Sequence, residues 1–227
     1  MTHISLDFWH TLAEPNPLYA ETRKQILSEY FGFSPAEAAV RYKTAKREWE
    51  TSAHLTGNVL DYGELREHLA QVFGLRIPEP KFRNMVWAMR CGFRKDPPRL
   101  VSHEIWTLLR SFPEKHGVTL SIGSNTNFLI RGDEIRRLLP EGLFAFQQYS
   151  DEEGICKPNP EFFARALVTA TRDGRVKSPR DFVHVGDNHV CDVEAPARLG
   201  LRSYIVADQN QLLNVLKDKE AECYAFG

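Results

Sequence analysis

The sequence predicts an α/β fold, in which a doubly wound parallel sheet forms a core domain and a helical cap domain is inserted into that core. Two patterns lead to this prediction. In the second half of the chain, short apolar runs that end in polar residues alternate with helical patterns, which is typical of parallel sheets covered by helices. After the first such run, about ninety residues show almost no strand pattern. A chain of 227 residues is long enough for a core and a smaller inserted domain.

Strands and helices alternate regularly in the predicted core. The predicted strands are residues 3–8, 118–123, 143–146, 181–186 and 201–206. Helical patterns precede or separate the later strands, at residues 102–112, 128–139, 160–171 and 190–199. Each helix returns the chain to the end of the sheet at which the previous strand began. We therefore expect parallel strands, helices on both faces and right-handed crossovers.

The cap is predicted from four helical segments, which are residues 17–31, 35–54, 62–73 and 81–91. Each segment is followed by helix-breaking residues, namely Gly32, Gly57, Gly74 and the Pro97–Pro98 pair. The chain is therefore expected to divide into a core of residues 1–13 and 99–227 and a cap of residues 14–98.

The composition excludes several classes of protein. Lys and Arg number 29 and Asp and Glu number 30, so the formal net charge is −1 and a protein built to coat nucleic acid or an anionic membrane is not expected. No apolar run approaches the ~18 residues of a membrane-spanning helix. The first residues do not resemble a signal peptide, and the four scattered cysteines form no metal or disulfide pattern. We therefore expect a cytoplasmic protein that acts on a small molecule, with an oligomeric state that the sequence does not indicate.

Polar side chains lie at or after the carboxyl ends of four predicted strands, where ligands bind in open parallel sheets. In chain order they are Asp7, Thr11, Ser124, Asn125, Lys157, Asp187 and Asp192. Three carboxylates in one partly buried crevice repel one another unless a cation lies among them. Mg²⁺ fits such a site, because it prefers oxygen ligands and retains bound water. A metal ion beside a lysine can hold a dianionic phosphoryl group, which a carboxylate can attack.

In order and spacing, these segments resemble the four motifs of the haloacid dehalogenase superfamily. The most specific parts are Gly186-Asp187-x4-Asp192 and Lys157-Pro158-x-Pro160. Members of this family pair a Rossmann-like core with a helical cap inserted just after the first motif, and the resemblance covers essentially the whole chain. It implies a hydrolase.

The resemblance also implies a role for each matching residue. Asp7 would be the nucleophile that forms a covalent aspartyl intermediate, and Thr11 would position the loop of the first motif. Ser124 and Asn125 would donate hydrogen bonds to the oxygens of the transferring phosphoryl group. Lys157 would neutralise charge on Asp7 and on the phosphate.

A Mg²⁺ site is implied in the same way. Asp7, Asp187 and Asp192 would hold the ion directly or through water, together with the backbone carbonyl of Trp9. The expected activity is Mg²⁺-dependent hydrolysis of a small phosphorylated metabolite through an aspartyl phosphate on Asp7.

One position departs from the phosphatase pattern of the family. Phosphatases usually carry a second aspartate in the first motif, which protonates the leaving group and later activates water; here that residue is Trp9. An indole cannot act as a general acid or base, and the loss of such a group typically removes ~10²- to 10⁴-fold of rate. His10, at a position that is usually glycine, is one candidate for a substitute acid.

Two other functions stay open at this point. The 2-haloacid dehalogenases also lack the second aspartate and often carry an aromatic residue there, and a halide needs no acid to leave. They do not need Mg²⁺, however, so the pair Asp187 and Asp192 would have no role. Alternatively, the chain binds a phosphorylated ligand or a protein partner without catalysis.

Other residues allow two interpretations each. His184 lies inside an apolar strand and is predicted to be a hydrogen-bonded core residue, whereas His189 either lines the crevice or faces solvent. The end of the cap is rich in Lys and Arg. This stretch is either a solvated surface, or it places Arg83, Trp87 and Arg90 along one helical stripe that faces the crevice and recognises an anionic substrate.

Overall fold

The computed structural model describes residues 2–226, and its centre is a parallel five-stranded sheet. The strands are β1 (His3–Leu6), β4 (Thr119–Ser124), β5 (Phe146–Tyr149), β6 (Phe182–Gly186) and β7 (Arg202–Ile205). Their order is β5-β4-β1-β6-β7, and every neighbouring pair is parallel. The chain runs outward from β1 to β5 and then crosses to β6 and β7 on the other side of β1. The predicted doubly wound α/β core is confirmed, and its strand order reverses at β1.

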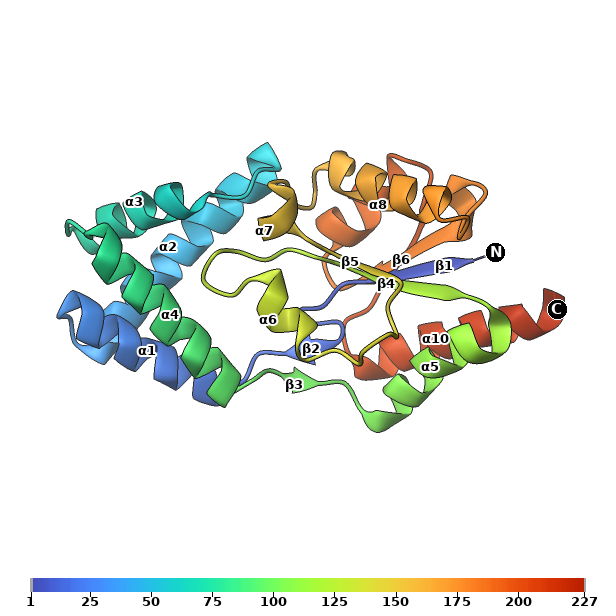
Figure 1. The fold of residues 1–227 in the computed structure, drawn as a ribbon, viewed down its shortest axis with the longest axis horizontal. Coiled ribbons are helices and arrows are strands. Elements are labelled where there is room, and N and C mark those ends of the chain that lie inside the picture. Colours follow the sequence, from blue (N-terminus) through green and yellow to red (C-terminus); the bar gives the residue numbers. More distant parts are fainter. Residues whose placement is uncertain (1, 227) are drawn as a thin grey trace.

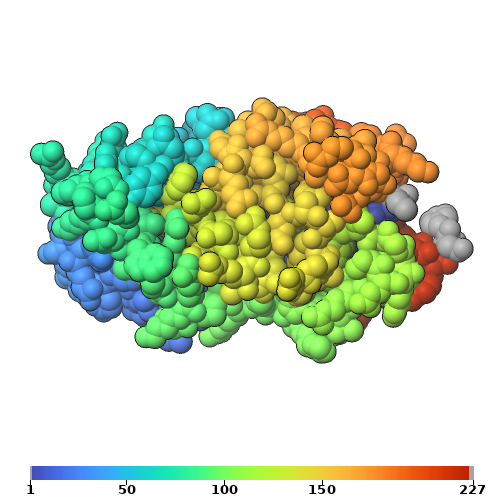
Figure 2. Space-filling view, in the orientation of Figure 1, coloured from blue at the N-terminus to red at the C-terminus, as the bar shows by residue number. Residues whose placement is uncertain are grey.

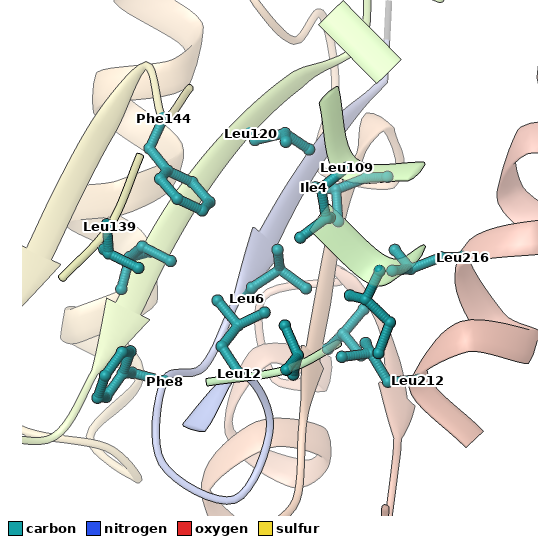
Figure 3. Close-up of a cluster of buried hydrophobic side chains, with 14 of the residues drawn as sticks. Ile4, Leu6, Phe8, Leu12, Leu109, Leu120, Leu139, Phe144, Leu212 and Leu216 are labelled. Atoms are coloured by element: carbon teal, nitrogen blue, oxygen red, sulfur yellow. The ribbon is translucent and has the colours of Figure 1, made fainter. Parts of the chain in front are cut away.

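Helices cover both faces of the sheet (Figure 1). They are α5 (His103–His116), α6 (Gly132–Arg136), α7 (Ser150–Glu153), α8 (Pro160–Arg172), α9 (Ala195–Ala197) and α10 (Gln209–Phe226). Ile4 and Leu6 of β1 pack on one face against Leu109 of α5 and Leu212 and Leu216 of α10 (Figure 3). The other face is covered by a second apolar cluster that includes Phe162, Phe163, Ala166 and Phe182. The sheet is therefore buried on both sides, as parallel sheets usually are.

The cap segment forms four helices that lie together at one end of the molecule (Figure 1). They are α1 (Pro17–Phe31), α2 (Pro35–Thr56), α3 (Tyr62–Phe73) and α4 (Glu79–Lys95). The side chains of Asn16, Ser34 and Asp61 cap the first three helices at their N-termini. All four helices bury residues in a cluster separate from the two clusters of the sheet; its members include Leu27, Trp49, Leu69, Phe73, Phe82 and Met85.

A short antiparallel ribbon joins the cap helices to the sheet. It consists of β2 (Ala13–Glu14) and β3 (Arg99–Leu100), with Ala13 opposite Leu100. The predicted boundaries, 13/14 and 98/99, fall at this ribbon. The division of the chain into a core domain and a cap domain stays a prediction.

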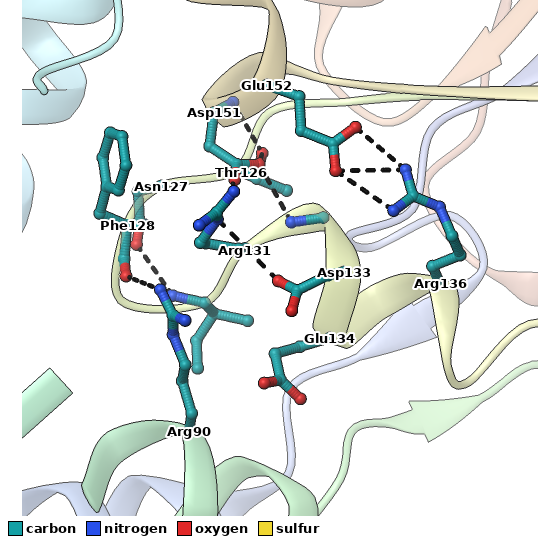
Figure 4. A network of polar contacts seen from close by, with 12 residues as sticks. Arg90, Thr126, Asn127, Phe128, Arg131, Asp133, Glu134, Arg136, Asp151 and Glu152 are labelled. Carbon is teal, nitrogen blue, oxygen red and sulfur yellow. Dashed lines mark hydrogen bonds and ion pairs between the residues drawn. The ribbon is translucent and has the colours of Figure 1, made fainter. Parts of the chain in front are cut away.

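The expected helix at residues 128–139 is wrong over much of its length. The structure has an irregular segment before α6, which spans only Gly132–Arg136. The side chain of Asn127 accepts hydrogen bonds from the backbone N–H groups of Leu129 and Ile130, and Leu129 is buried among the cap residues. The Asp151 carboxylate accepts bonds from Arg131 and from the Gly132 N–H (Figure 4). These local hydrogen bonds and the contact with the cap replace a regular helix.

Other elements differ less from the expectation. Strand β5 begins three residues later than the start predicted at 143, and α5 continues through Pro113 to His116. The segment predicted as a helix at 190–199 begins as a π-helix, His189–Glu194, and continues into α9. Elements α10, β2 and β3 were not predicted from the residue patterns.

Within residues 2–226, each helix is too short or too polar to cross a lipid bilayer.

Candidate active site

A cavity of about 410 Å³ lies between the carboxyl ends of the strands and the cap helices. This volume is typical of a small-molecule site. The core residues that line it include Asp7, Ser124, Asn125, Lys157, Asp187 and Asp192. The structure therefore brings these six predicted site residues to one cavity from four segments that are far apart in the sequence.

Lys157 connects two of the carboxylates. Its Nζ donates a hydrogen bond to Asp7 Oδ1 at 2.9 Å and to Asp192 Oδ1 at 2.6 Å. All three side chains are almost fully buried. Asp7 is directly after β1, so the reversal of strand order places it between the loops that follow β4 and β6.

Asp192 reaches this position because the chain after β6 is closely packed. A Cβ atom on Gly186 would lie 2.3 Å from Asp192 Cγ, so only glycine leaves room for the carboxylate. Asp192 lies in the π-helix His189–Glu194, a distortion that is frequent at functional sites. Its Oδ2 accepts a hydrogen bond from the backbone N–H of Asn188 at 2.9 Å.

His184 also holds Asp192. Its Nε2 lies 3.0 Å from Asp192 Oδ1, and its Nδ1 lies 3.1 Å from the hydroxyl of Ser5. The imidazole is completely buried, so both ring nitrogens are satisfied within the core. The apolar strand pattern predicts a core position for His184 but not its contact with Asp192. The strand alternation could have indicated this contact. His184 and Gly186 are two residues apart and therefore lie on the same face of β6, and Gly186 faces Asp192.

Burial and charge set the protonation of this cluster. Burial raises the pKa of Asp7; the Lys157 ammonium opposes this shift but does not offset burial together with the negative charges of Asp192 and Asp187. Burial also acts on Asp192, but Lys157 and His184 outweigh it and hold its pKa below the usual range. The pKa of Lys157 is raised, because the two carboxylates outweigh its burial. Lys157 is therefore a persistent cation beside Asp7.

The carboxylates form a donor set that fits a hard divalent cation. Asp7, Asp187 and Asp192 each offer an oxygen, and these oxygens lie within 4.8 Å of one another. Three ionised carboxylates beside the one ammonium of Lys157 give the cluster a formal charge of −2, which one dication would neutralise. Burial and the neighbouring charge of Asp192 raise the pKa of Asp187, as expected where negative groups are crowded together.

The predicted phosphoryl-binding residues have different surroundings. Ser124 lines the cavity and is fully buried, and no described residue accepts or donates a hydrogen bond at its hydroxyl. The amide of Asn125 binds the backbone N–H and carbonyl of Lys157, each at 2.9 Å. Asn125 therefore positions Lys157, and its predicted contact with a phosphoryl group stays a prediction. Thr11 is buried beside the first loop but is not among the residues that line the cavity.

Trp9 and His10 lie at the wall of the cavity. The indole of Trp9 packs edge-on against Phe8 and against Phe93 of α4. His10 has a φ of 57°, which explains why glycine suits this position, and its ring lies 3.0 Å from Glu14. Position 9 itself therefore offers no carboxylate to the cavity, and the metal contact predicted for the Trp9 carbonyl stays a prediction.

The basic side chains at the end of the cap are not among the residues that line the cavity. Arg83, Trp87 and Arg90 do not line the cavity. Trp87 is 60% exposed, and Arg90 donates a hydrogen bond to the carbonyl of Phe128. His189 is exposed and is paired with a glutamate in its own helical turn.

Instead, α1 and α2 supply much of the cap face, through residues that include Tyr19, Arg23, Tyr42, Lys46, Trp49 and Glu50. Sequence reasoning missed these residues. Positions 42, 46, 49 and 53 recur at helical spacing, which identifies one face of α2 but not the surface that this face contacts.

Further hydrogen bonds fix the cap helices to the core segments around the site. Arg94 of α4 binds both carboxylate oxygens of Glu134 at 2.7 and 2.5 Å. At the end of α2, the Gly57 carbonyl accepts a hydrogen bond from the N–H of Cys156, which precedes Lys157. In Figure 2, the cap helices and the neighbouring core segments form one continuous surface on this face.

Comparisons with known proteins agree with this geometry. Residues 1–200 match the family of haloacid dehalogenase-like hydrolases. The human protein "Haloacid dehalogenase-like hydrolase domain-containing protein 3" is 35% identical over 75 residues, which are 33% of this chain and 28% of that protein. Its mouse counterpart is 30% identical over 104 residues, or 46% of this chain and 39% of that protein. The match thus spans less than half the length of these curated relatives.

Solved structures share the fold. The 2-haloacid dehalogenase from Pseudomonas syringae pv. Tomato DC3000 superposes with a TM-score of 0.67 at 18% identity, and covers 96% of this chain and 99% of that one. The HAD-hydrolase YfnB from Bacillus subtilis, in a magnesium-bound crystal form, has a TM-score of 0.64 at 13% identity and covers 95% and 98%. At these identities the likeness shows the fold alone. Because the family match covers most of the chain, this protein belongs to the haloacid dehalogenase-like hydrolases.

Proposed function

We propose that this chain is a Mg²⁺-dependent phosphatase that hydrolyses a small phosphorylated metabolite through an aspartyl phosphate on Asp7. One observation carries the proposal: the buried ammonium of Lys157 bridges Asp7 and Asp192 beside Asp187, at the wall of a cavity. A site with this charge pattern suits a dianionic phosphoryl group held against a nucleophilic carboxylate.

Asp7, Lys157 and Ser124 would each have a separate role in this reaction. A carboxylate oxygen of Asp7 attacks phosphorus, and the bond from phosphorus to the ester oxygen breaks with its electron pair on that oxygen. Lys157 neutralises charge on Asp7 and on the phosphoryl group, and the unpaired hydroxyl of Ser124 donates to a phosphoryl oxygen. Water then attacks phosphorus, its proton passes to solvent, and the bond from phosphorus to the Asp7 oxygen breaks with its electron pair on that oxygen, which releases inorganic phosphate and restores the Asp7 carboxylate.

The expected metal ligands are the carboxylates that still have oxygens without a hydrogen bond. Both oxygens of Asp192 accept hydrogen bonds, whereas no residue within 2–226 other than Asp187 itself donates to the Asp187 carboxylate. Asp7 and Asp187 would therefore contact Mg²⁺ directly, and Asp192 would act through Lys157 or water. When bound, Mg²⁺ would neutralise the carboxylates and the phosphoryl oxygens.

Within the described part of the chain, the site lacks an evident group that could protonate the leaving oxygen of the ester. Trp9 supplies no proton, and His10 is half-exposed beside Glu14. An ester whose leaving oxygen is weakly basic needs little protonation, so we propose that such esters are turned over faster than ordinary alkyl phosphates.

A 2-haloacid dehalogenase activity is the second candidate. It is favoured by Trp9, an aromatic residue at the cavity wall that suits a leaving group with no need for an acid. The cluster of three carboxylates argues against it, because a halide displacement gives Asp187 no role. The chain could also hold a phosphorylated ligand without turning it over, and the experiment separates this third case.

The test is a paired screen of phosphate esters and 2-haloacids, with Mg²⁺ and with EDTA. We expect phosphate release that requires Mg²⁺ and falls to background in Asp7→Asn. The matched control is Asp218→Asn, at an exposed carboxylate of α10 that does not line the cavity. Halide release in EDTA would select the dehalogenase, and Mg²⁺ binding with neither activity would show a site that has lost catalysis.

A further inference from the structure

Arg23 is a guanidinium without a partner at the cap face of the cavity. Its Cζ lies 4.6 Å from the ring centroid of Tyr42 and 5.6 Å from that of Tyr19. Within residues 2–226, no carboxylate forms an ion pair with Arg23 and no side chain or carbonyl accepts its hydrogen bonds. The guanidinium therefore stacks on aromatic rings, and its five N–H donors have no acceptor among the described residues.

Two cationic side chains of α2 are paired with carboxylates, whereas the Asp96 carboxylate, which also lines the cavity, accepts a hydrogen bond from Thr22. Lys46, which lines the same cavity, pairs with Glu50 at 3.1 Å. Arg41 also stacks on an aromatic ring, that of Phe33, but it binds the carboxylate of Glu37. Stacking is thus combined with an acidic partner at Arg41, whereas at Arg23 the partner is missing.

The surroundings of Arg23 favour binding of an anion. Tyr19, Tyr42 and Trp49 are buried and line the cavity beside it, and Phe93 extends this aromatic wall. Aromatic walls exclude water, and a charge-assisted hydrogen bond is stronger where water is excluded. The planar guanidinium matches a carboxylate or a phosphate, which it can bind through two parallel hydrogen bonds.

We infer that Arg23 forms an anion-binding subsite, so that the substrate is a phosphomonoester with a second anionic group, such as a carboxylate, on its carbon skeleton. The inference rests on the proposed function, because it assumes that the phosphoryl group lies at Asp7 and Lys157. Arg23 and the nucleophile line one cavity of about 410 Å³, a volume typical of a site for one small molecule.

The experiment compares two phosphonates that differ at one end, 3-phosphonopropionate and propylphosphonate. Their dissociation constants are measured by calorimetry in saturating Mg²⁺, for the full chain and its variants. We expect the wild type to bind 3-phosphonopropionate about 10- to 100-fold more tightly, as a charge-assisted pair contributes. Arg23→Gln should remove this preference while leaving the affinity for propylphosphonate within about 3-fold of its wild-type value.

Two more variants refine the comparison. Arg23→Lys keeps the charge but loses the planar donor pair, so it should keep part of the preference. Arg47→Gln removes an exposed arginine of α2 that does not line the cavity, and it should keep all of it.

Each outcome decides the matter. A preference that persists in Arg23→Gln, or an equal loss of affinity for both phosphonates, overturns the subsite. Binding of both phosphonates without preference by the wild type overturns the subsite but leaves the proposed phosphoryl site intact. If the wild type binds neither phosphonate, the proposed function and the subsite fail together.

Discussion

The cavity has two halves, and they hold charge differently. In the core half, the ionised groups contact one another: Lys157 bridges Asp7 and Asp192, and His184 and the Asn188 N–H complete the hydrogen bonds of Asp192. In the cap half, aromatic rings surround a guanidinium that has no acidic partner.

This difference indicates separate tasks. A closed network of buried charges has a fixed geometry, which bond making requires. A guanidinium that stacks on aromatic rings and has no acidic partner can donate hydrogen bonds to a bound ligand, which suits ligand recognition. Changes in the core half should therefore alter the chemical step and the stability of the fold, whereas changes in the cap half should alter which ligands bind.

Replacement of Lys157 should have the largest effect. Lys157→Met leaves Asp7 and Asp192 buried without their cation, which should cost about 3–5 kcal/mol of unfolding free energy in EDTA. Without the ammonium to stabilise charge, kcat should fall by about 10²- to 10³-fold. Urea unfolding and steady-state kinetics measure the two effects.

The matched control is the same substitution in the cap half. Lys46 also lines the cavity and is also ion-paired, but its pair with Glu50 is exposed. Lys46→Met should change the unfolding free energy by less than about 1 kcal/mol. If the two lysine variants lose similar stability, the contrast between the halves is wrong.

Restoring an acid at position 9 should have the next largest effect. Under the proposed function, Trp9→Asp should raise kcat for glycerol 2-phosphate by about 10²-fold, the lower end of what a general acid contributes. The rise for p-nitrophenyl phosphate should be smaller, because its leaving group needs little protonation. Trp9→Phe supplies no acid and serves as the control; a rate for Trp9→Asp no higher than that of Trp9→Phe would contradict our account of the missing acid.

The core half was largely predictable from the sequence, for a topological reason. Parallel strands deliver their following residues to one edge of a sheet, so Asp7, Ser124, Lys157 and Asp187 were expected to meet once the strands were identified. The residues that position them were harder to predict. The bonds of Asn125 to the Lys157 backbone depend on exact loop conformations, which residue patterns do not specify.

The cap half was not predictable in the same way. Periodicity located the helices closely, because caps and left-handed glycines such as Gly32 and Gly74 fix their ends. It did not show which helix faces the cavity, since the packing of one helix on another depends on side-chain shapes along the whole contact. The basic stretch of α4 therefore suggested Arg83 and Arg90, whereas the cavity is lined by Arg23 of α1.

The attachment of the cap to the core should show an intermediate effect on stability. Arg94→Met leaves Glu134 without its bidentate partner, and the Glu134 side chain is only 1% exposed. We expect a loss of about 1–3 kcal/mol in unfolding free energy, measured by urea titration, from a buried carboxylate left unsatisfied. Arg165→Met breaks surface pairs with Glu161 and Glu153 and should cost clearly less than Arg94→Met. Equal costs would mean that the Arg94 pair does not secure α4 to the core.

The smallest effect concerns a buried polar group in the core that lies away from the site. His3 is at the opposite end of β1 from Asp7, and its ring binds the hydroxyls of Thr119 and Ser121. Burial, with a further contribution from Arg175, lowers its pKa from 6.5 to about 3.

Between these pH values the unfolded chain binds a proton at His3 that the folded chain does not, so stability must fall as the pH falls. The expected contribution is about 1.4 kcal/mol per pH unit below 6.5, and urea titrations from pH 6.5 to 5 avoid most carboxylate titration. The pKa of buried His184 is also lowered, mainly by burial, so the wild-type slope includes both histidines. His3→Gln should remove only the His3 part and leave kcat at pH 7.5 unchanged, because His3 does not line the cavity. If the slope of unfolding free energy against pH is unaltered in His3→Gln, His3 is protonated in the folded protein as in the unfolded chain. A changed kcat would mean that buried polar groups away from the cavity also affect the chemical step in its core half.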